Sequence, residues 1–182
     1  MTIATLQDRV QETFNVQGFI CHSPTDLSAA FPHGGTEIGL FGQMIFKVTP
    51  TRAEITAEEY ANQTVEIIEG AENVVVAASL REFNATAIGL LFPGLASGGP
   101  SRTMTTQRGA LGSARGKKIL LSPLSSEDQP ALLLYRAVPL VDEALSLSYH
   151  LDEEWGIGAV FLGLPDATGR LYAMNTLDKL AL

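Results

Sequence analysis

The chain has 182 residues, of which 46% are hydrophobic and 18% charged, a balance typical of a globular domain with a sizeable core. Its net charge of −8 argues against a general nucleic-acid-binding protein, because neutralising phosphates requires clustered lysine and arginine. The single cysteine, Cys21, excludes an internal disulfide framework, and no apolar run reaches the roughly 18 residues of a membrane helix.

The first 35 residues predict short elements and loop. "TLQDRVQETF" is compatible with a short helix and "VQGFICHS" with a short strand, and the N-terminus lacks the basic and apolar regions of a secretory signal. "SPTDLSAAFPHGG" contains two prolines and two glycines, which predict a loop. Neighbours on a strand point to opposite faces, so Cys21 and His22 are a poor nucleophile–base pair.

The next segment alternates between apolar and polar residues. In "QMIFKVTP" the residues Met44, Phe46 and Val48 share one face, and "TRAEIT" continues the period-2 pattern of a strand. Pro50 lies between the two and predicts a bend or an edge position. The preceding "GGTEIGLFG" lacks the lysine and hydroxyl of a phosphate loop, and a strand follows it, so its glycines are expected in turns or bulges.

An irregular stretch is expected next, before "AENVVVAASLREF", which carries the strongest strand signal of the first half. "ATAIGLLF" then has apolar residues at helical spacing. It predicts a short helix at about residues 84–93, with Asn84 as its N-cap and one face on a sheet. Residues from about 96 to 116 have no period, and a loop this long indicates a function or a segment that orders on a partner.

The second half predicts a run of strands, namely "KKILLSPL", "ALLLYRAVPL", "ALSLSYHL", "GIGAVFLGL" and "GRLYAM". "PDATG" is expected to join the last two as a hairpin. Short strands at regular spacing predict a mainly β fold, in which antiparallel sheets form a sandwich or barrel with one short helix on its side. Residues 34–182 are expected to form a single domain, and residues 1–33 have no assigned role.

Charge is unevenly distributed along the chain. From Glu54 to Glu72 there are six acids and no base, whereas from Phe83 to Ser126 there are five bases and no acid. Two interpretations stay open: a solvated acidic face beside a mobile basic loop, or two surfaces that meet across a subunit boundary. In the second interpretation the acidic interface comprises Glu54, Glu58, Glu59, Glu66 and Glu69, and the inter-subunit loop comprises Arg102, Arg108, Arg115, Lys117 and Lys118.

Motifs for catalysis or metal binding are weak. The acidic cluster lacks the glycine-centred spacing of a calcium loop, which favours a solvated surface. There is no nucleophile elbow and no zinc-protease motif. We therefore expect a protein that is not an enzyme and has no cofactor or metal. The alternative is a small β-sandwich binding module or a metal-dependent enzyme that uses His150, Asp152 and Glu154, although polar residues are expected anyway where a strand enters a turn.

Three stretches carry a family pattern. "GGTEIGLFGQMIFKVTPTRAEITAEEY" looks like a glycine-containing turn with a first long strand, and "VEIIEGAENVVVAASLREFNATAIGLLFPG" like a strand, a short helix and a variable loop. The last stretch runs from "KKILLSPL" through "LLLYRAVPLVDEALSLSYHLDEEWG" to a final "P-D-x-x-G-x-L-Y". In this order the features, over roughly residues 34–175, resemble the major tail tube proteins of long-tailed bacteriophages.

The resemblance implies a structural virion protein that assembles into hexameric rings, stacked as the tail tube through which the genome passes. Its implied partners are copies of itself, the tape-measure protein and tail-end proteins, with DNA passing unbound and no membrane involved. It would reside in the virion tail, and in the host cytoplasm during assembly. Tube-end, baseplate and injection-system tube proteins share this fold and stay open as alternatives. In such a tube the five glutamates of the acidic interface would face either a neighbouring subunit or the lumen, and a net-negative lumen would repel DNA.

Overall fold

The structure, a computed structural model, describes residues 11–14, 17–57, 63–81, 85–91, 112–124, 130–141 and 157–182. The strands in these ranges are β1 (Gln11–Phe14), β2 (Gly18–His22), β3 (Thr36–Ala57), β4 (Gln63–Leu80), β5 (Lys117–Pro123), β6 (Ala131–Val141), β7 (Ile157–Gly163) and β8 (Tyr172–Asn175). The helices are α2 (Ala85–Leu91) and two 3-10 turns, η2 (Gly112–Arg115) and η3 (Leu177–Lys179). All pairings among these described strands are antiparallel, which confirms the predicted mainly β fold.

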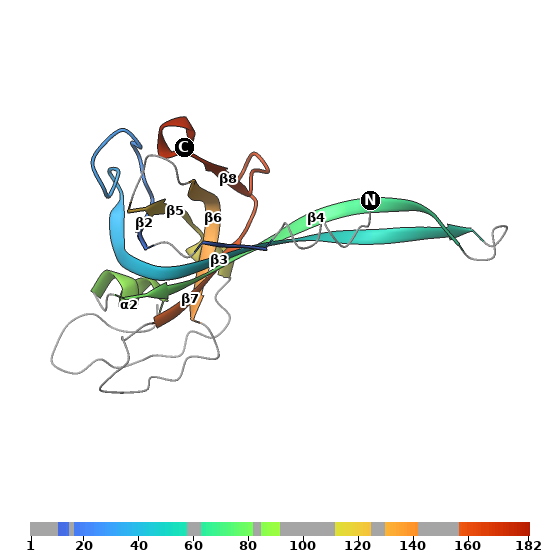
Figure 1. Ribbon diagram of the computed structural model, residues 1–182, viewed down its shortest axis with the longest axis horizontal. Coiled ribbons are helices and arrows are strands. Elements are labelled where there is room, and N and C mark those ends of the chain that lie inside the picture. Colours follow the sequence, from blue (N-terminus) through green and yellow to red (C-terminus); the bar gives the residue numbers. More distant parts are fainter. Residues whose placement is uncertain are drawn as a thin grey trace.

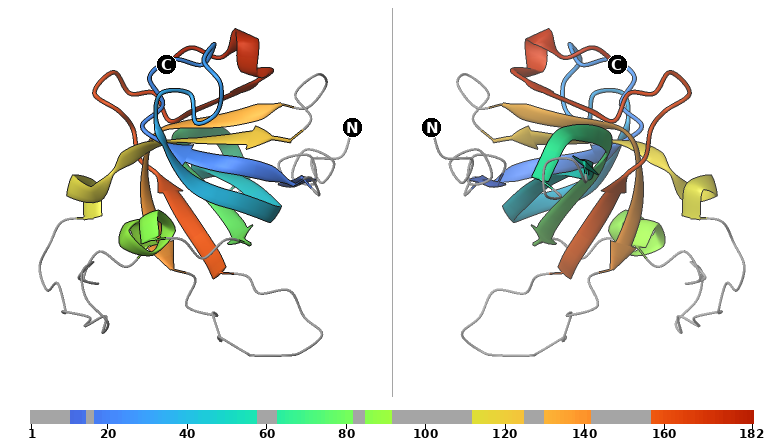
Figure 2. Two further views of the ribbon diagram at one scale, coloured as in Figure 1. Left: turned by 90° about the vertical axis from the view of Figure 1, so that its left-hand side faces the viewer. Right: turned by 90° about the vertical axis from the view of Figure 1, so that its right-hand side faces the viewer.

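Six strands close into a barrel. Their order is β3–β2–β5–β6–β7–β4, and β4 returns to pair with β3 (Figures 1 and 2). Closure gives the barrel strands a partner on each side, which removes the exposed edges of an open sheet. β2 is one of these strands, so part of the N-terminal segment without an assigned role is integral to the barrel.

The barrel interior is filled by alternate side chains of every strand. Ile20, Val76 and Phe161 are fully buried there, and they come from β2, β4 and β7. Ala87 and Leu91 of α2 belong to the same core. α2 contacts both β3 and β6, which lie across the barrel from each other, so the helix covers one end of the barrel. The predicted short helix is confirmed, but it covers an end of the barrel and not its side, because its apolar residues join the barrel core. Its predicted N-cap, Asn84, lies outside the described residues.

A second, smaller core lies on the outside of β2, β5 and β6. Its fully buried members are Cys21, Leu120, Ala131 and Leu133. Residues 23–35 and the C-terminal segment cover it with Leu27, Phe31, Leu177, Leu180 and Leu182. These strands are therefore buried on both faces, which explains the continuous apolar runs in "KKILLSPL" and "ALLLYRAVPL".

Two local predictions in the first half are wrong. Gln11–Phe14, expected in a short helix, is a strand that pairs with residues 44–47 of β3. The stretch expected to be irregular before "AENVVV" begins β4 at Gln63, because it forms a ladder with β3 that two register shifts interrupt but do not end. In both cases pairing with a distant strand decides the backbone, and local propensity does not.

The predicted C-terminal hairpin is also wrong. β7 and β8 both pair with β6, on the same edge, with Gly163 opposite Ala137 and Tyr172 opposite Leu134. Residues 164–171 thus form a loop between two strands that pair with successive parts of the same edge of β6. The predicted strand "ALSLSYHL" and residues 96–111 of the predicted long loop lie outside the described residues.

Candidate assembly surfaces

β3 and β4 continue past the barrel as a two-stranded ribbon (Figure 1). β4 last pairs with β7 at Val74, which lies opposite Val48 of β3, so the ribbon comprises residues 49–57 and 63–73. At ~3.4 Å per residue, residues 49–57 extend about 30 Å. Among the described strands only β3 and β4 pair along it. The β3–β4 pairing shifts register between Pro50 and Arg52, so β3 continues through the proline with an irregular ladder at the position where a bend or an edge was predicted.

One face of the ribbon is largely apolar. Ala53 lies opposite Ile68, and Ile55 opposite Glu66, and residues paired in this way share a face. Ile55 is 42% exposed and Ile68 52% exposed. Ile67, which is 51% exposed, lies on the other face opposite Glu54. Isoleucines this exposed, gathered on a projecting element, are typical of a contact surface.

The ribbon is also acidic. Its described residues carry one base, Arg52, and four acids, namely Glu54, Glu66, Glu69 and Glu72. Glu54 accepts a hydrogen bond from the Thr64 hydroxyl at 3.1 Å. Of the predicted acidic surface, Glu54 and Glu66 are exposed on the ribbon, Glu69 belongs to β4, and Glu58 and Glu59 lie outside the described residues. The predicted acidic connection is therefore largely strand.

A cleft of about 400 Å³ lies beside α2 and η2, and Figure 1 shows α2 at the end of the barrel remote from the ribbon. Its lining residues are His22, Thr86, Gly89, Leu90, Ala114, Arg115, Lys117 and Pro139. Two of these are basic and one is a histidine, and none of the described residues that line it is acidic. We call it the basic cleft.

The predicted basic segment has mixed roles. Arg115 Nη2 donates hydrogen bonds to the carbonyl oxygens of Leu90 at 3.3 Å and Pro139 at 3.1 Å, which ties η2 to α2 and β6. Lys117 is exposed at the start of β5, and Lys118 follows it, partly buried. Arg102 and Arg108 lie outside the described residues. Of the five predicted residues, the structure thus brings Arg115 and Lys117 together in the basic cleft.

Cys21 and His22 point to opposite sides of β2, as expected for neighbours on a strand. Cys21 is fully buried in the outer core, and burial, together with the nearby charge of Glu37, raises the pKa of its thiol to about 12. His22 lines the basic cleft, and its partial burial, followed by the charge of Lys117, lowers the pKa of the imidazole. The thiol is therefore no nucleophile, and the imidazole is a neutral group at pH 7 beside the charged Lys117.

The glycines of "GGTEIGLFG" serve the backbone, as predicted. Gly34 has a φ of 69°, and a Cβ there would lie 2.2 Å from Thr25 Oγ1. Gly39 has a φ of 140° and pairs with Ile20 where the β2–β3 register shifts. One glycine therefore occupies a turn and the other an irregular point of the ladder.

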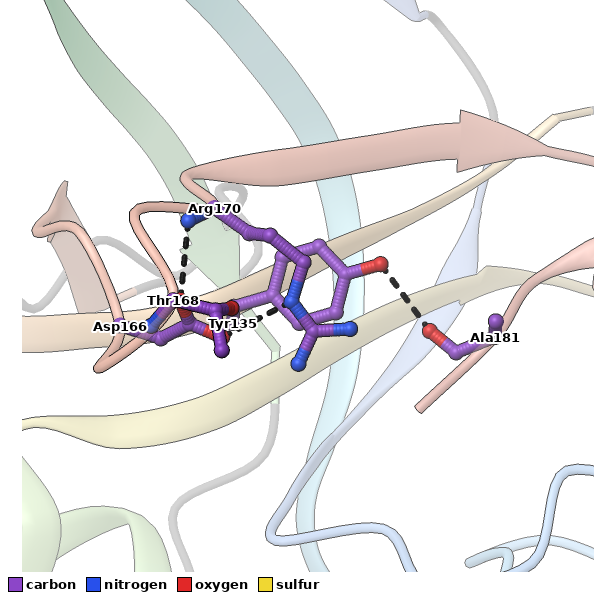
Figure 3. Close-up of polar contacts among 5 residues, drawn as sticks. All are labelled: Tyr135, Asp166, Thr168, Arg170 and Ala181. Carbon is purple, nitrogen blue, oxygen red and sulfur yellow. Dashed lines mark hydrogen bonds and ion pairs between the residues drawn. The ribbon is translucent and has the colours of Figure 1, made fainter.

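The loop of residues 164–171 forms a polar network that the sequence did not single out (Figure 3). Asp166 Oδ1 accepts hydrogen bonds from the backbone N–H groups of Thr168 at 2.8 Å and Arg170 at 2.9 Å. Arg170 Nε lies 2.9 Å from Asp166 Oδ2, and its guanidinium lies 4.0 Å from the Tyr135 ring centroid. Tyr135 donates its hydroxyl hydrogen to the Ala181 carbonyl at 3.1 Å. The network joins the loop, β6 and the C-terminal segment.

These bonds set the charge state of Asp166. Burial alone would raise the pKa of its carboxyl, but hydrogen bonds from the Thr168 hydroxyl and from the backbone and side chain of Arg170 outweigh it, so the pKa lies well below its usual range. The aspartate-to-threonine spacing of two in "PDATGR" is the local signal that predicts such a turn.

His150, Asp152 and Glu154 lie outside the described residues. Within the part of the chain that the structure describes, no three His, Cys, Asp or Glu side chains are grouped so as to hold a metal ion. No described helix has the length and apolar character needed to cross a membrane. No protein-family model matches the chain, and no curated protein sequence matches it either.

Proposed function

We propose that the chain is a structural subunit that assembles with copies of itself into stacked rings, as the tail tube of a long-tailed bacteriophage. The observation that carries this proposal is the ribbon, which exposes Ile55, Ile67 and Ile68 beyond the barrel. A two-stranded ribbon is marginally stable alone in water, and the outer edge of each of its strands can pair with a further strand. Burial of the ribbon against a neighbouring molecule accounts for both its length and its exposed isoleucines.

Sequence and shape together support a second copy of the chain as the partner. The ribbon is built from "TPTRAEITA" and "QTVEIIEGAEN", which fall inside the region that resembles the tail tube proteins. A projection at one end of a subunit makes a heterologous contact with a different surface of the next copy. Such contacts close into rings when the rotation allows it, and extend into filaments otherwise. Six copies in a ring is the number that the family resemblance implies.

The proposed tube fits the charge of the chain. A net charge of −8 suits a channel that DNA passes without binding, because an acidic wall repels phosphates. The tape-measure protein and tail-end proteins are the further partners in this proposal, and the virion tail is its location. The protein has no catalytic role in it.

The test is negative-stain electron microscopy of the purified, untagged protein across a concentration series, with light scattering on the same samples. We expect rings or tubes with a central hole above a threshold concentration, and a matching rise in scattered intensity. A monodisperse monomer at every concentration up to the solubility limit would refute the proposal. Solid aggregates without a hole would leave self-association but refute a tube.

A further inference from the structure

We propose that the ribbon of one copy docks in the basic cleft of the next copy, with Glu66 placed against Lys117 and Ile55 against the apolar wall of the cleft. This inference rests on the proposed self-assembly and names the two surfaces that form the contact. Three observations carry it: the charges of the two surfaces, their positions on the subunit, and the fact that each surface places an apolar group beside a charged one.

The charges are complementary. The described part of the ribbon carries four acids against one base. The positive charges of the basic cleft are those of Lys117 and Arg115, since the lowered pKa of His22 leaves its imidazole neutral at pH 7. None of the described residues that line the cleft is acidic. Arg115 is already hydrogen-bonded to two carbonyl groups, but its guanidinium charge still contributes to the potential of the cleft. A recess lined by one sign of charge concentrates its field and attracts the opposite charge.

The ribbon and the basic cleft lie at opposite ends of one subunit, so a contact between them requires two molecules. Figure 1 shows α2, which lines the basic cleft, at the end of the barrel away from the ribbon. The ribbon extends in the other direction for about 30 Å, at ~3.4 Å per residue over residues 49–57. It cannot reach the cleft of its own subunit without losing the β3–β4 pairing, so the contact has to form between copies. When the same contact forms between successive copies, it joins them head to tail.

Each of the two surfaces also carries apolar side chains next to a charged one. On the ribbon Ile55 lies directly opposite Glu66, which places an apolar side chain beside a carboxylate on one face. In the basic cleft Leu90 and Pro139 lie beside Lys117. Docking in this orientation buries Ile55 against apolar atoms and brings the Glu66 carboxylate to the Lys117 ammonium. Neither charge is left buried without its partner.

The experiment reverses one charge on each surface. In Lys117→Glu the ribbon keeps Glu66 and the cleft carries a glutamate at position 117. In Glu66→Lys the ribbon carries a lysine at position 66 and the cleft keeps Lys117. Each variant alone should raise the concentration at which light scattering reports assembly by about tenfold or more, because like charges then meet. A 1:1 mixture of the two should assemble near the wild-type concentration, since each ribbon then finds an opposite charge.

Both substituted residues are exposed, so the monomers should keep the wild-type circular dichroism spectrum and unfolding midpoint. Lys179→Glu, an exposed lysine on η3 outside the basic cleft, is the matched control and should assemble like the wild type. Assembly of Lys117→Glu or Glu66→Lys at the wild-type concentration overturns the docking alone. Loss of assembly that the mixture fails to restore also overturns the pairing of these two surfaces. A wild-type chain that stays monomeric overturns both the docking and the proposed function.

Discussion

The apolar face of the ribbon can be tested by replacing Ile55 and Ile68 with threonine. Threonine is β-branched and favours strands, so Ile55→Thr/Ile68→Thr should keep the β3–β4 pairing while removing apolar surface. Both residues lie beyond the last pair that β4 makes with β7. The barrel core contains neither of them, so unfolding of the barrel should be close to that of the wild type.

The expected effect on assembly follows from the exposed fractions. Full burial of an isoleucine is worth about 1.5–3 kcal/mol. Ile55 is 42% exposed and Ile68 52% exposed in the free subunit, so about half of that gain is still available to each on docking. The pair then contributes about 2 kcal/mol to each contact, and 1.4 kcal/mol is a tenfold change in affinity. Since threonine keeps one methyl group, the double variant should assemble at a concentration higher by up to about 30-fold.

The assay is sedimentation velocity across a concentration series, with urea unfolding of the dilute monomer to check the fold. Leu162→Thr on β7 is the control, because Leu162 is 37% exposed and lies on the barrel. It should assemble like the wild type. If the double variant assembles at the wild-type concentration while its monomer stays folded, the apolar face of the ribbon is not part of the contact, and the reasoning fails.

Three further predictions concern the subunit itself. Arg115→Met removes two charge-assisted hydrogen bonds from a partly exposed side chain, and should lower the free energy of unfolding by about 1–2 kcal/mol; an unchanged urea midpoint would show that water satisfies both carbonyls equally well. Cys21, with a thiol pKa of about 12 and no exposed surface, should react with a disulfide reagent at pH 8 only as fast as the protein unfolds, and rapid stoichiometric labelling would contradict its burial. Asp166→Asn should be less stable than the wild type at pH 7. Because the folded-state pKa of Asp166 lies below its usual 3.8, the difference should shrink as the pH falls below 3.8, and a difference independent of pH would exclude the carboxylate as its source.

The sequence predicted those elements whose signals are local. The alternation of Met44, Phe46 and Val48 places a strand, and the helical spacing in "ATAIGLL" places α2. "PDATGR" carries a turn signal, but the role of its loop depends on Tyr135 and Ala181, which lie far away in sequence. Local patterns identify elements, and they do not identify the partners of those elements.

The remaining features depend on pairing between distant segments. Residues 63–70 look irregular alone and become strand only beside β3. β8 was expected to pair with β7, yet its register is set by residues 131–134 of β6. Arg115 looks like a solvated cation in a glycine-rich stretch, because its carbonyl partners are 24 and 25 residues away. The candidate surfaces could be predicted as acidic and basic segments, but their place at opposite ends of a barrel could not.

The long β3–β4 pairing has a consequence for the order of folding. Its register runs from Ala57 opposite Gln63 to Phe41 opposite Leu80, so the hairpin can grow outward from contacts between near neighbours in sequence. Barrel closure needs β2 beside β5, where Gly18 meets Pro123, and contacts so far apart in the chain form slowly. We therefore expect the strands that carry the exposed isoleucines to form before the barrel is complete. During refolding, unpaired strand edges and exposed isoleucines are then present while the barrel core is still incomplete. Because aggregation depends on concentration, dilution should favour recovery of the native subunit.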